Sequence, residues 1–261
     1  MPRFSANLST LFGEHDFLDR FAAAAEAGFK AVEFQFPYGF DKSAVAERLA
    51  ANGLEVVLHN MPPGDADAGD RGMACFPDRI GEFQDSVGKA VDYATAIGCK
   101  QLNCLSGIKP DNLDSDLAQR TLIDNLAFSS KALGEAGIRQ LIEPINSRDM
   151  PGFFLNTSGQ AIAIMDAVGS DNLYLQYDFY HMQIMEGDLA ATFATLRPRI
   201  AHVQFADSPG RHEPGTGEIH YPFLFSWIDR AGYDGWVGAE YHPKTSTSDS
   251  LAWFQPYRPN A

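Results

Sequence analysis

Two kinds of segment alternate along this chain. Some stretches repeat apolar residues every three or four positions, as in 17–25 and 87–96, and this spacing is typical of helices that cover a core. Others are short apolar runs rich in β-branched residues, which are typical of buried strands. Because the two kinds follow one another through most of the chain, the pattern predicts strand–helix units around a parallel sheet.

Glycine marks the junctions where a predicted helix passes into the next strand. It stands just before an apolar run at Gly28, Gly53, Gly98, Gly137 and Gly232. Glycine reaches the left-handed conformation that ends a helix without a Cβ clash. We place eight strands near residues 4–8, 30–35, 54–59, 100–104, 138–143, 173–178, 200–206 and 235–240.

Eight strand–helix units favour a closed barrel, and we predict an α/β fold with a single (β/α)₈ TIM barrel over residues 1–261. The length of 261 residues is normal for one such domain, and no linker-like stretch divides it. No Gly-x-Gly-x-x-Gly motif follows the first strand, which weighs against a dinucleotide-binding fold. The longest irregular segments, 60–77 and 208–221, follow strands, on the side where a barrel builds its active site.

The composition excludes several classes of protein. Apolar residues make up 45% of the chain, and the formal net charge is −14. Such a surface repels nucleic acid and anionic lipid, so we expect no nucleic-acid partner. The sequence has neither a membrane-spanning run nor the apolar core of a signal peptide, so we expect no membrane association and a cytoplasmic location. Cys75, Cys99 and Cys104 form no C-x-x-C pair and are expected to be buried thiols.

Polar residues end four consecutive predicted strands: Glu143, Asp178, Gln204 and Glu240. Since neighbouring strands lie about 4.8 Å apart, these groups can converge on one point. Carboxylates this close raise one another's pKa, and a divalent cation would relieve the repulsion. Oxygen ligands suit Mg²⁺ or Mn²⁺ better than zinc. A lone acidic residue at a strand end is usually a helix cap, but capping does not require such alignment across strands.

Three histidines are candidate substrate contacts. His181 follows the predicted ligand Asp178 by three residues, His202 shares a strand face with Gln204, and His59 closes the third strand. Each could instead be a core or turn histidine with its hydrogen bonds satisfied, and for His202 the two readings are equally weighted. His181 is the better functional candidate because it follows a predicted ligand into the pocket.

An acidic protein needs a local cation to capture an anionic substrate, because its net charge repels the substrate at long range. Arg211 lies in a loop rich in proline and glycine after the seventh strand, and Arg71 lies in the long loop after the third. A guanidinium can hold a carboxylate through two hydrogen bonds. We favour Arg211 for this role, although it could also be a solvated loop charge.

Taken together, these motifs resemble the hydroxypyruvate isomerase family within the xylose isomerase-like barrel superfamily. The resemblance spans nearly the whole chain and is carried by residues 4–8, 31–34, 58–65, 142–146, 177–181, 202–204, 209–214 and 238–241. It implies that Glu143, Asp178, Gln204 and Glu240 bind the metal and that Glu143 and Glu240 are also the acid/base pair. Sugar epimerases of the superfamily usually have histidine where this chain has Gln204, which favours the hydroxypyruvate branch.

The resemblance implies an isomerase that interconverts hydroxypyruvate and tartronate semialdehyde, with a small 2-oxo acid as its partner. A 2-oxo-tetronate isomerase shares these motifs, and a ketose 3-epimerase would use the same carboxylate pair on a neutral sugar. An endonuclease-IV-like hydrolase would need a histidine-rich site and a basic groove, which this chain lacks. A non-catalytic small-molecule binding protein would need no acid/base pair. A homo-oligomer is compatible with the sequence, which does not set the number of subunits.

Overall fold

The computed structural model describes residues 1–258 and has eight parallel strands that form one closed barrel. The strands are β1 (Arg3–Asn7), β2 (Ala31–Phe34), β3 (Glu55–Asn60), β4 (Gln101–Asn103), β5 (Arg139–Ile142), β6 (Leu173–Asp178), β7 (Ile200–Phe205) and β8 (Trp236–Ala239). They lie in chain order around the barrel, and β1 pairs with β8 to close it. The predicted barrel is confirmed, and each strand lies within one residue of its predicted bounds at either end.

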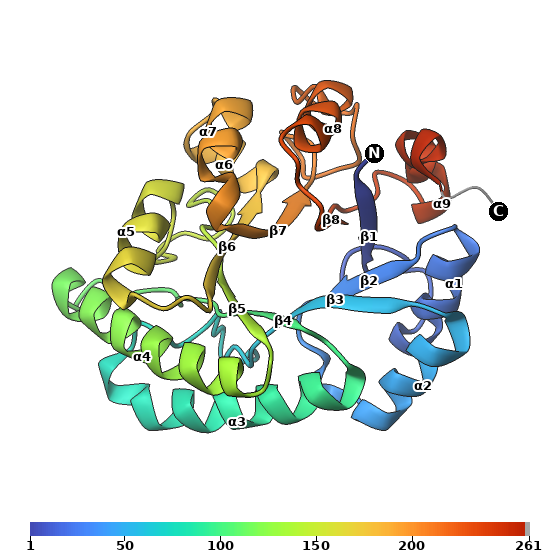
Figure 1. Ribbon diagram of the computed structural model, residues 1–261. Coiled ribbons are helices and arrows are strands. Elements are labelled where there is room, and N and C mark those ends of the chain that lie inside the picture. The colour runs from blue at the N-terminus through green and yellow to red at the C-terminus, as the bar shows by residue number, and fades with distance from the viewer. Residues whose placement is uncertain (259–261) are drawn as a thin grey trace.

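Helices surround this ring of strands on its outside (Figure 1). They are α1 (Arg20–Glu26), α2 (Lys42–Asn52), α3 (Ile80–Ile97), α4 (Ser115–Glu135), α5 (Ser158–Val168), α6 (Phe179–Met185), α7 (Leu189–Leu196), α8 (Tyr221–Arg230) and α9 (Thr247–Ser250). Short 3₁₀ turns precede α1, α3 and β7. No helix within residues 1–258 is long and apolar enough to cross a membrane.

The helix-to-strand junctions use glycine as the sequence predicts. Gly53 ends α2 with φ 60°, and Gly98 ends α3 with φ 76°. In each case the next residue donates its backbone N–H back into the last helical turn, Leu54 to Leu49 and Cys99 to Ala94. This closure turns the chain directly into the following strand.

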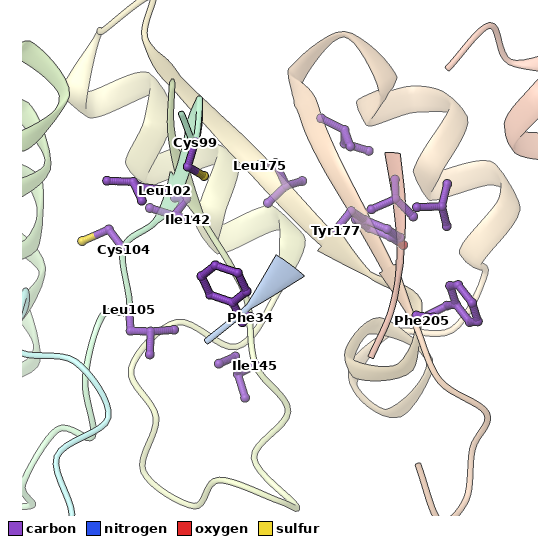
Figure 2. Close-up of a cluster of buried hydrophobic side chains, with 14 of the residues drawn as sticks. Phe34, Cys99, Leu102, Cys104, Leu105, Ile142, Ile145, Leu175, Tyr177 and Phe205 are labelled. Atoms are coloured by element: carbon purple, nitrogen blue, oxygen red, sulfur yellow. The ribbon is translucent and has the colours of Figure 1, made fainter. Parts of the chain in front are cut away.

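The main core lies between the strands and the helices. Figure 2 shows part of it, where Leu175, Tyr177 and Phe205 are buried. Cys99 and Cys104 belong to the same cluster, and Cys75 is buried as well. All three thiols are free, as expected, and burial raises the pKa of each to about 12. They are therefore uncharged and unreactive at neutral pH.

The carboxyl ends of the strands form one edge on which the candidate residues lie. In the β6–β7 ladder Asp178 is paired directly with Gln204. Strands β5 and β8 end at Ile142 and Ala239, so Glu143 and Glu240 come one residue after the strands rather than at their last position. Because each residue directly follows its strand, the strand fixes its backbone, and its carboxylate can reach the open end of the barrel.

Candidate active site

A cavity of about 270 Å³ opens at the carboxyl ends of the strands. Its lining includes Glu143, Gln204, Arg211 and Glu240, together with a carboxylate from β2, Glu33. This is the face of a barrel on which active sites are built. The cavity therefore brings together residues from both halves of the chain.

Glu143 is an almost completely buried carboxyl group just after β5. Asn103 Nδ2, at the end of β4, donates a hydrogen bond to its Oε2 at 2.7 Å. Burial raises the pKa of Glu143 well above its ordinary value, and the nearby charges of Glu240 and Asp178 raise it further. The charge of Arg211 acts in the opposite direction, and further positive charge nearby would favour the ionised form of Glu143.

Asp178 has two oxygens with different surroundings. Oδ1 caps α6 by accepting from the backbone N–H of Tyr180 at 2.7 Å. Oδ2 is buried and has no hydrogen-bond partner among residues 1–258. Burial raises the pKa of Asp178 to about 7. An unpartnered buried carboxylate oxygen is costly, so this atom is suited to a ligand that the protein itself does not supply.

His181 lies in the first turn of α6, close to both acids. Its Nε2 is 3.6 Å from Asp178 Oδ2 and 3.9 Å from Glu143 Oε1. Burial, with the charge of Arg211, lowers the pKa of His181 well below its ordinary value, so the ring is neutral. Each of the three residues offers one ligand atom, these atoms lie within 4.8 Å of one another, and the group could hold a metal ion.

The hydrogen bonds of Asn146 determine which His181 nitrogen carries the proton. Its Oδ1 accepts from the backbone N–H groups of Arg148 and Asp149, at 3.1 and 2.8 Å. The amide nitrogen must then point the other way, and it lies 2.7 Å from His181 Nδ1. A neutral imidazole that accepts at Nδ1 carries its proton on Nε2. His181 is therefore oriented as a hydrogen-bond donor toward the two acids and the cavity.

Glu240, just after β8, is held by three donors. Arg211 Nη2 lies 2.9 Å from Oε2, while Gln35 Nε2 and Asn7 Nδ2 donate to Oε1 at 2.8 and 3.2 Å. Its carboxylate is thus ion-paired and fixed in direction. The two glutamates consequently stand in contrasting surroundings, since Glu143 receives one amide hydrogen bond and Glu240 receives a cation and two amides.

Arg211 occupies an unusual backbone position for a residue with a side chain. Its φ is 55°, and its carbonyl accepts from His242 N at 2.8 Å. The guanidinium lies 5.4 Å from the ring centre of Tyr180 and is mostly buried. Its Nε is buried and has no partner in the described part of the chain. The guanidinium therefore serves Glu240 through Nη2, while its buried Nε–H lacks an acceptor among these residues.

Gln204 is bonded on both sides of its amide. Nε2 donates to Glu33 Oε1 at 2.7 Å, and Oε1 accepts from Gln176 Nε2 at 2.5 Å. Beneath it, His202 Nε2 lies 2.8 Å from Glu33 Oε2. The structure thus places His202 under the site as a partner of Glu33, not in the cavity lining.

His59 lies apart from the other candidates. It is fully buried, its ring is stacked 6.1 Å from that of Phe34, and its Nδ1 is 3.0 Å from the Asn60 carbonyl. It is not among the residues that line the cavity. The geometry places His59 in the aromatic core beside the site.

The sequence places the candidate residues at the carboxyl ends of the strands, where the cavity lies, but misses several polar residues around them. The sequence pattern does not single out Glu33, or the amides of Asn7, Asn103 and Asn146, as site residues. Their position in the strands could have identified two of them. Asn7 and Asn103 are the last residues of their strands, and each is followed by a loop on the face where barrels build active sites.

The site passes a test of fit for a divalent cation. Its donor set is rich in oxygen, it contains the unpartnered Asp178 Oδ2, and burial and neighbouring charges raise the pKa of Glu143. A hard cation that prefers oxygen ligands would bind the unpartnered Asp178 Oδ2 and would offset the repulsion between the carboxylates. The residues present fit Mg²⁺ or Mn²⁺.

Known proteins resemble this chain over nearly its whole length. The family model of xylose isomerase-like TIM barrels matches residues 21–257. Hydroxypyruvate isomerase of Escherichia coli (strain K12) is 51% identical, covering 99% of this chain and 100% of that protein. A 2-oxo-tetronate isomerase of Cupriavidus necator is 48% identical, covering 98% and 99%. A solved structure from Brucella melitensis, described as an AP endonuclease of family 2, is 47% identical with a TM-score of 0.97, covering 99% and 100%.

Proposed function

This chain belongs to the xylose isomerase-like TIM barrel family, and we propose that it interconverts hydroxypyruvate and tartronate semialdehyde. Curated relatives that are 42–51% identical over nearly the whole chain are named isomerases, and this chain is an isomerase too. The observation that carries the proposal is the pair of carboxylates with contrasting surroundings, Glu143 and Glu240. Two carboxyl groups whose environments differ in this way are suited to separate acid and base roles.

The reaction moves one hydrogen between adjacent carbons. Removal of the proton from C3 leaves its electron pair in a new C2–C3 double bond, while the C2 carbonyl oxygen becomes negative in an enediolate. Protonation at C2 and transfer of the proton from the C3 hydroxyl to the C2 oxygen then give the aldehyde with a hydroxyl group at C2. The carboxylate of Glu240, oriented by Arg211 and by the amides of Gln35 and Asn7, fits the base, and Glu143 fits the partner that returns a proton at C2.

His181 has a separate role in this scheme. Its neutral ring carries a proton on Nε2, because Asn146 donates to Nδ1. A donor that is already oriented can stabilise the negative oxygen of the enediolate without reorganising during the reaction. We therefore assign His181 to the substrate oxygen that gains charge.

The metal in this proposal is Mg²⁺ or Mn²⁺, held by Glu143, Asp178, Gln204 and Glu240. When bound, such an ion supplies positive charge that stabilises the developing oxyanion. The unpartnered oxygen of Asp178 supports its inclusion among the ligands. His181 is better suited to donate to the substrate, since its Nε2 carries the proton.

The substrate carboxylate needs a cation that is not already paired with an acid. Arg211 and Arg71 both line the cavity, but Arg211 is bound to Glu240. Among residues 1–258, Arg71 donates only to the backbone carbonyls of Asp70, at 2.7 Å, and Ala66, at 3.5 Å. We propose that Arg71 receives the carboxylate and that Arg211, which orients Glu240, borders the reacting end of the substrate.

The loop that carries Arg71 is firmly anchored. Asp70 Oδ2 accepts from Arg79 Nη2 and from Asp65 N, each at 2.7 Å. Gly72 has φ 102°, and a Cβ there would lie 2.4 Å from the Leu105 carbonyl oxygen, so the loop packs directly against the chain after β4. A fixed loop can hold the guanidinium at the cavity with little entropy lost on binding.

A second candidate substrate is 2-oxo-tetronate, favoured by the similarity to the Cupriavidus necator protein. Incubation in D₂O with hydroxypyruvate, tartronate semialdehyde, 2-oxo-tetronate and short ketoses, with and without EDTA, separates these functions. We expect deuterium incorporation and turnover with hydroxypyruvate. Turnover of ketoses alone would indicate an epimerase, and binding without exchange on any substrate would indicate a non-catalytic binding protein.

We also propose that the enzyme acts in the cytoplasm as a single barrel domain over residues 1–261 and can form a homo-oligomer. Its three free, buried cysteines support a reducing compartment. Its net charge of −14 supports a small-molecule partner rather than a nucleic acid. Gel filtration with light scattering would give the number of subunits.

A further inference from the structure

Glu33 is a fully buried carboxylate that the proposed reaction does not use. It lies on β2 and is surrounded by donors from other strands. Ser5 Oγ and Asn7 Nδ2 donate from β1 at 2.9 and 3.2 Å, and His202 Nε2 and Gln204 Nε2 approach from β7 at 2.8 and 2.7 Å. An ionised carboxylate has about four acceptor positions, so these donors fill its capacity.

The packing of β8 is adapted to this carboxylate. A Cβ at Gly238 would lie 2.3 Å from Glu33 Oε2 and 2.4 Å from Oε1. Gly238 itself has no left-handed φ, so its lack of a side chain serves space rather than backbone conformation. The position of Glu33 is therefore built by four strands, β1, β2, β7 and β8.

A carboxylate that only accepts hydrogen bonds determines the orientation of the amide beside it. Gln204 must turn its NH₂ group to Glu33, which leaves Oε1 as the amide atom able to bind a cation. That oxygen also accepts from Gln176 Nε2 at 2.5 Å. Gln176 must in turn present its own oxygen elsewhere, and this Oε1 is buried without a partner among residues 1–258.

We propose that Glu33 is a positioning residue that fixes the amides of Gln204 and Gln176 so that each presents oxygen to the metal and its surroundings. This inference rests on the proposed metal site, of which Gln204 is a member. An amide at position 33 could instead donate to Gln204, and the Gln204 amide would then turn its NH₂ group toward the cation. Glu33 thus keeps a neutral ligand correctly oriented without touching the metal.

The test measures the affinity of the metal-stripped full chain for Mn²⁺ by titration calorimetry. The variant Glu33→Gln keeps the size of the side chain but can donate, and we expect Mn²⁺ affinity to fall by about 10–100-fold, the usual effect of losing a partner behind a metal ligand. The control Ser5→Ala removes one donor to Glu33 and leaves its acceptor character intact, so its affinity should stay close to that of the wild type. Equal Mn²⁺ affinity in wild type and Glu33→Gln would overturn the proposal.

An exchanged pair distinguishes orientation from general damage. In the double variant Glu33→Gln, Gln204→Glu the residue at 204 presents oxygen in either orientation, and the amide at 33 can donate to it. We expect this variant to recover Mn²⁺ binding, and failure to recover it in a folded protein would contradict the proposal. Because the exchanged pair contains the same groups as the wild type, it also serves if Glu33→Gln alone does not fold.

A readout without metal separates this inference from the proposed function. In the metal-free wild type, the side-chain NH₂ of Gln204 should show slow hydrogen exchange by NMR because it donates to a buried carboxylate. Glu33→Gln should remove this protection, and its persistence would overturn the inference. If the wild type binds no Mn²⁺ at all, the metal site of the proposed function fails, while the NMR result still decides the role of Glu33.

Discussion

The guanidinium of Arg211 forms an ion pair with the carboxylate of Glu240, with 2.9 Å between Nη2 and Oε2. A cation that serves the proposed base has less capacity left for a substrate carboxylate. Arg71 borders the same cavity, and its hydrogen bonds within the described part of the chain go to backbone carbonyl groups only. The two arginines should therefore affect different kinetic parameters.

We expect Arg71→Met to raise KM for hydroxypyruvate about tenfold to a hundredfold, since a charge-assisted hydrogen bond typically contributes about 1.5–3 kcal/mol. A neutral ketose of similar length should be affected far less. The matched variant Arg211→Met should instead lower kcat for both substrates, because Glu240 loses its ionic partner. Equal losses on charged and neutral substrates in Arg71→Met would show that Arg71 serves loop structure rather than carboxylate recognition.

The acid/base pair can be tested by replacement with glutamine. Glu143→Gln and Glu240→Gln should each lower turnover by about 10²–10⁴-fold, the usual contribution of a positioned acid or base. Glutamine keeps the shape but cannot take up a proton from carbon. Deuterium incorporation and thermal unfolding would be measured together. Near-normal exchange in either folded variant would remove that residue from the role.

Removal of the metal should abolish activity. Dialysis against EDTA should stop turnover, and Mg²⁺ or Mn²⁺ should restore it. The added ion should also raise the melting temperature, since a ligand that binds only the folded state stabilises it. In Asp178→Asn this stabilisation should be much smaller, because the carboxylate that faces the site is lost. Full activity in excess chelator would contradict the metal requirement.

His59 should make stability depend on pH. Burial lowers its pKa to about 4, from an ordinary value of 6.5. Between these pH values the unfolded chain takes up a proton that the folded chain does not. The contribution of neutral His59 to the free energy of unfolding is therefore complete above pH 6.5 and is lost as the pH falls toward 4. A difference of this size corresponds to about 3 kcal/mol.

His59→Phe is the comparison variant for this effect, since phenylalanine suits the surrounding aromatic cluster and does not titrate. Urea unfolding of both proteins at several pH values between 7 and 4 would give the two free energies of unfolding. We expect the wild type to lose stability relative to His59→Phe across this interval. Parallel pH profiles would show that His59 does not titrate as its burial indicates.

Much of the fold is predictable because its signals are local. A glycine such as Gly53 ends a helix through its own backbone conformation, and the apolar run after it forms a strand whatever lies beyond. The strand ends locate the site for the same reason, since Asp178 is the last residue of β6 and Gln204 is the last but one of β7. Their pairing in neighbouring strands follows once the strands are placed in chain order.

The supporting network is harder to predict because its contacts are distant in sequence. Glu33 stands within an apolar run on β2, and His202 meets it from 169 residues away. A pattern along the chain does not show that a third residue, Gly238, leaves room for this carboxylate. The protonation of His181 is equally hidden, since it depends on how Asn146 bonds to its own loop.

The pairing of β1 with β8 has a consequence for how the protein becomes active during synthesis. Asn7 is made near the beginning of the chain, and Glu240, to which it donates, is made near the end. Contacts between such remote segments form late, because long loops must close first. A nascent chain released before β8 would lack the two ladders that β8 forms with β7 and β1, and it would lack one of the two proposed catalytic carboxylates. Catalysis should therefore begin only when the barrel closes, so an incomplete chain could not process substrate.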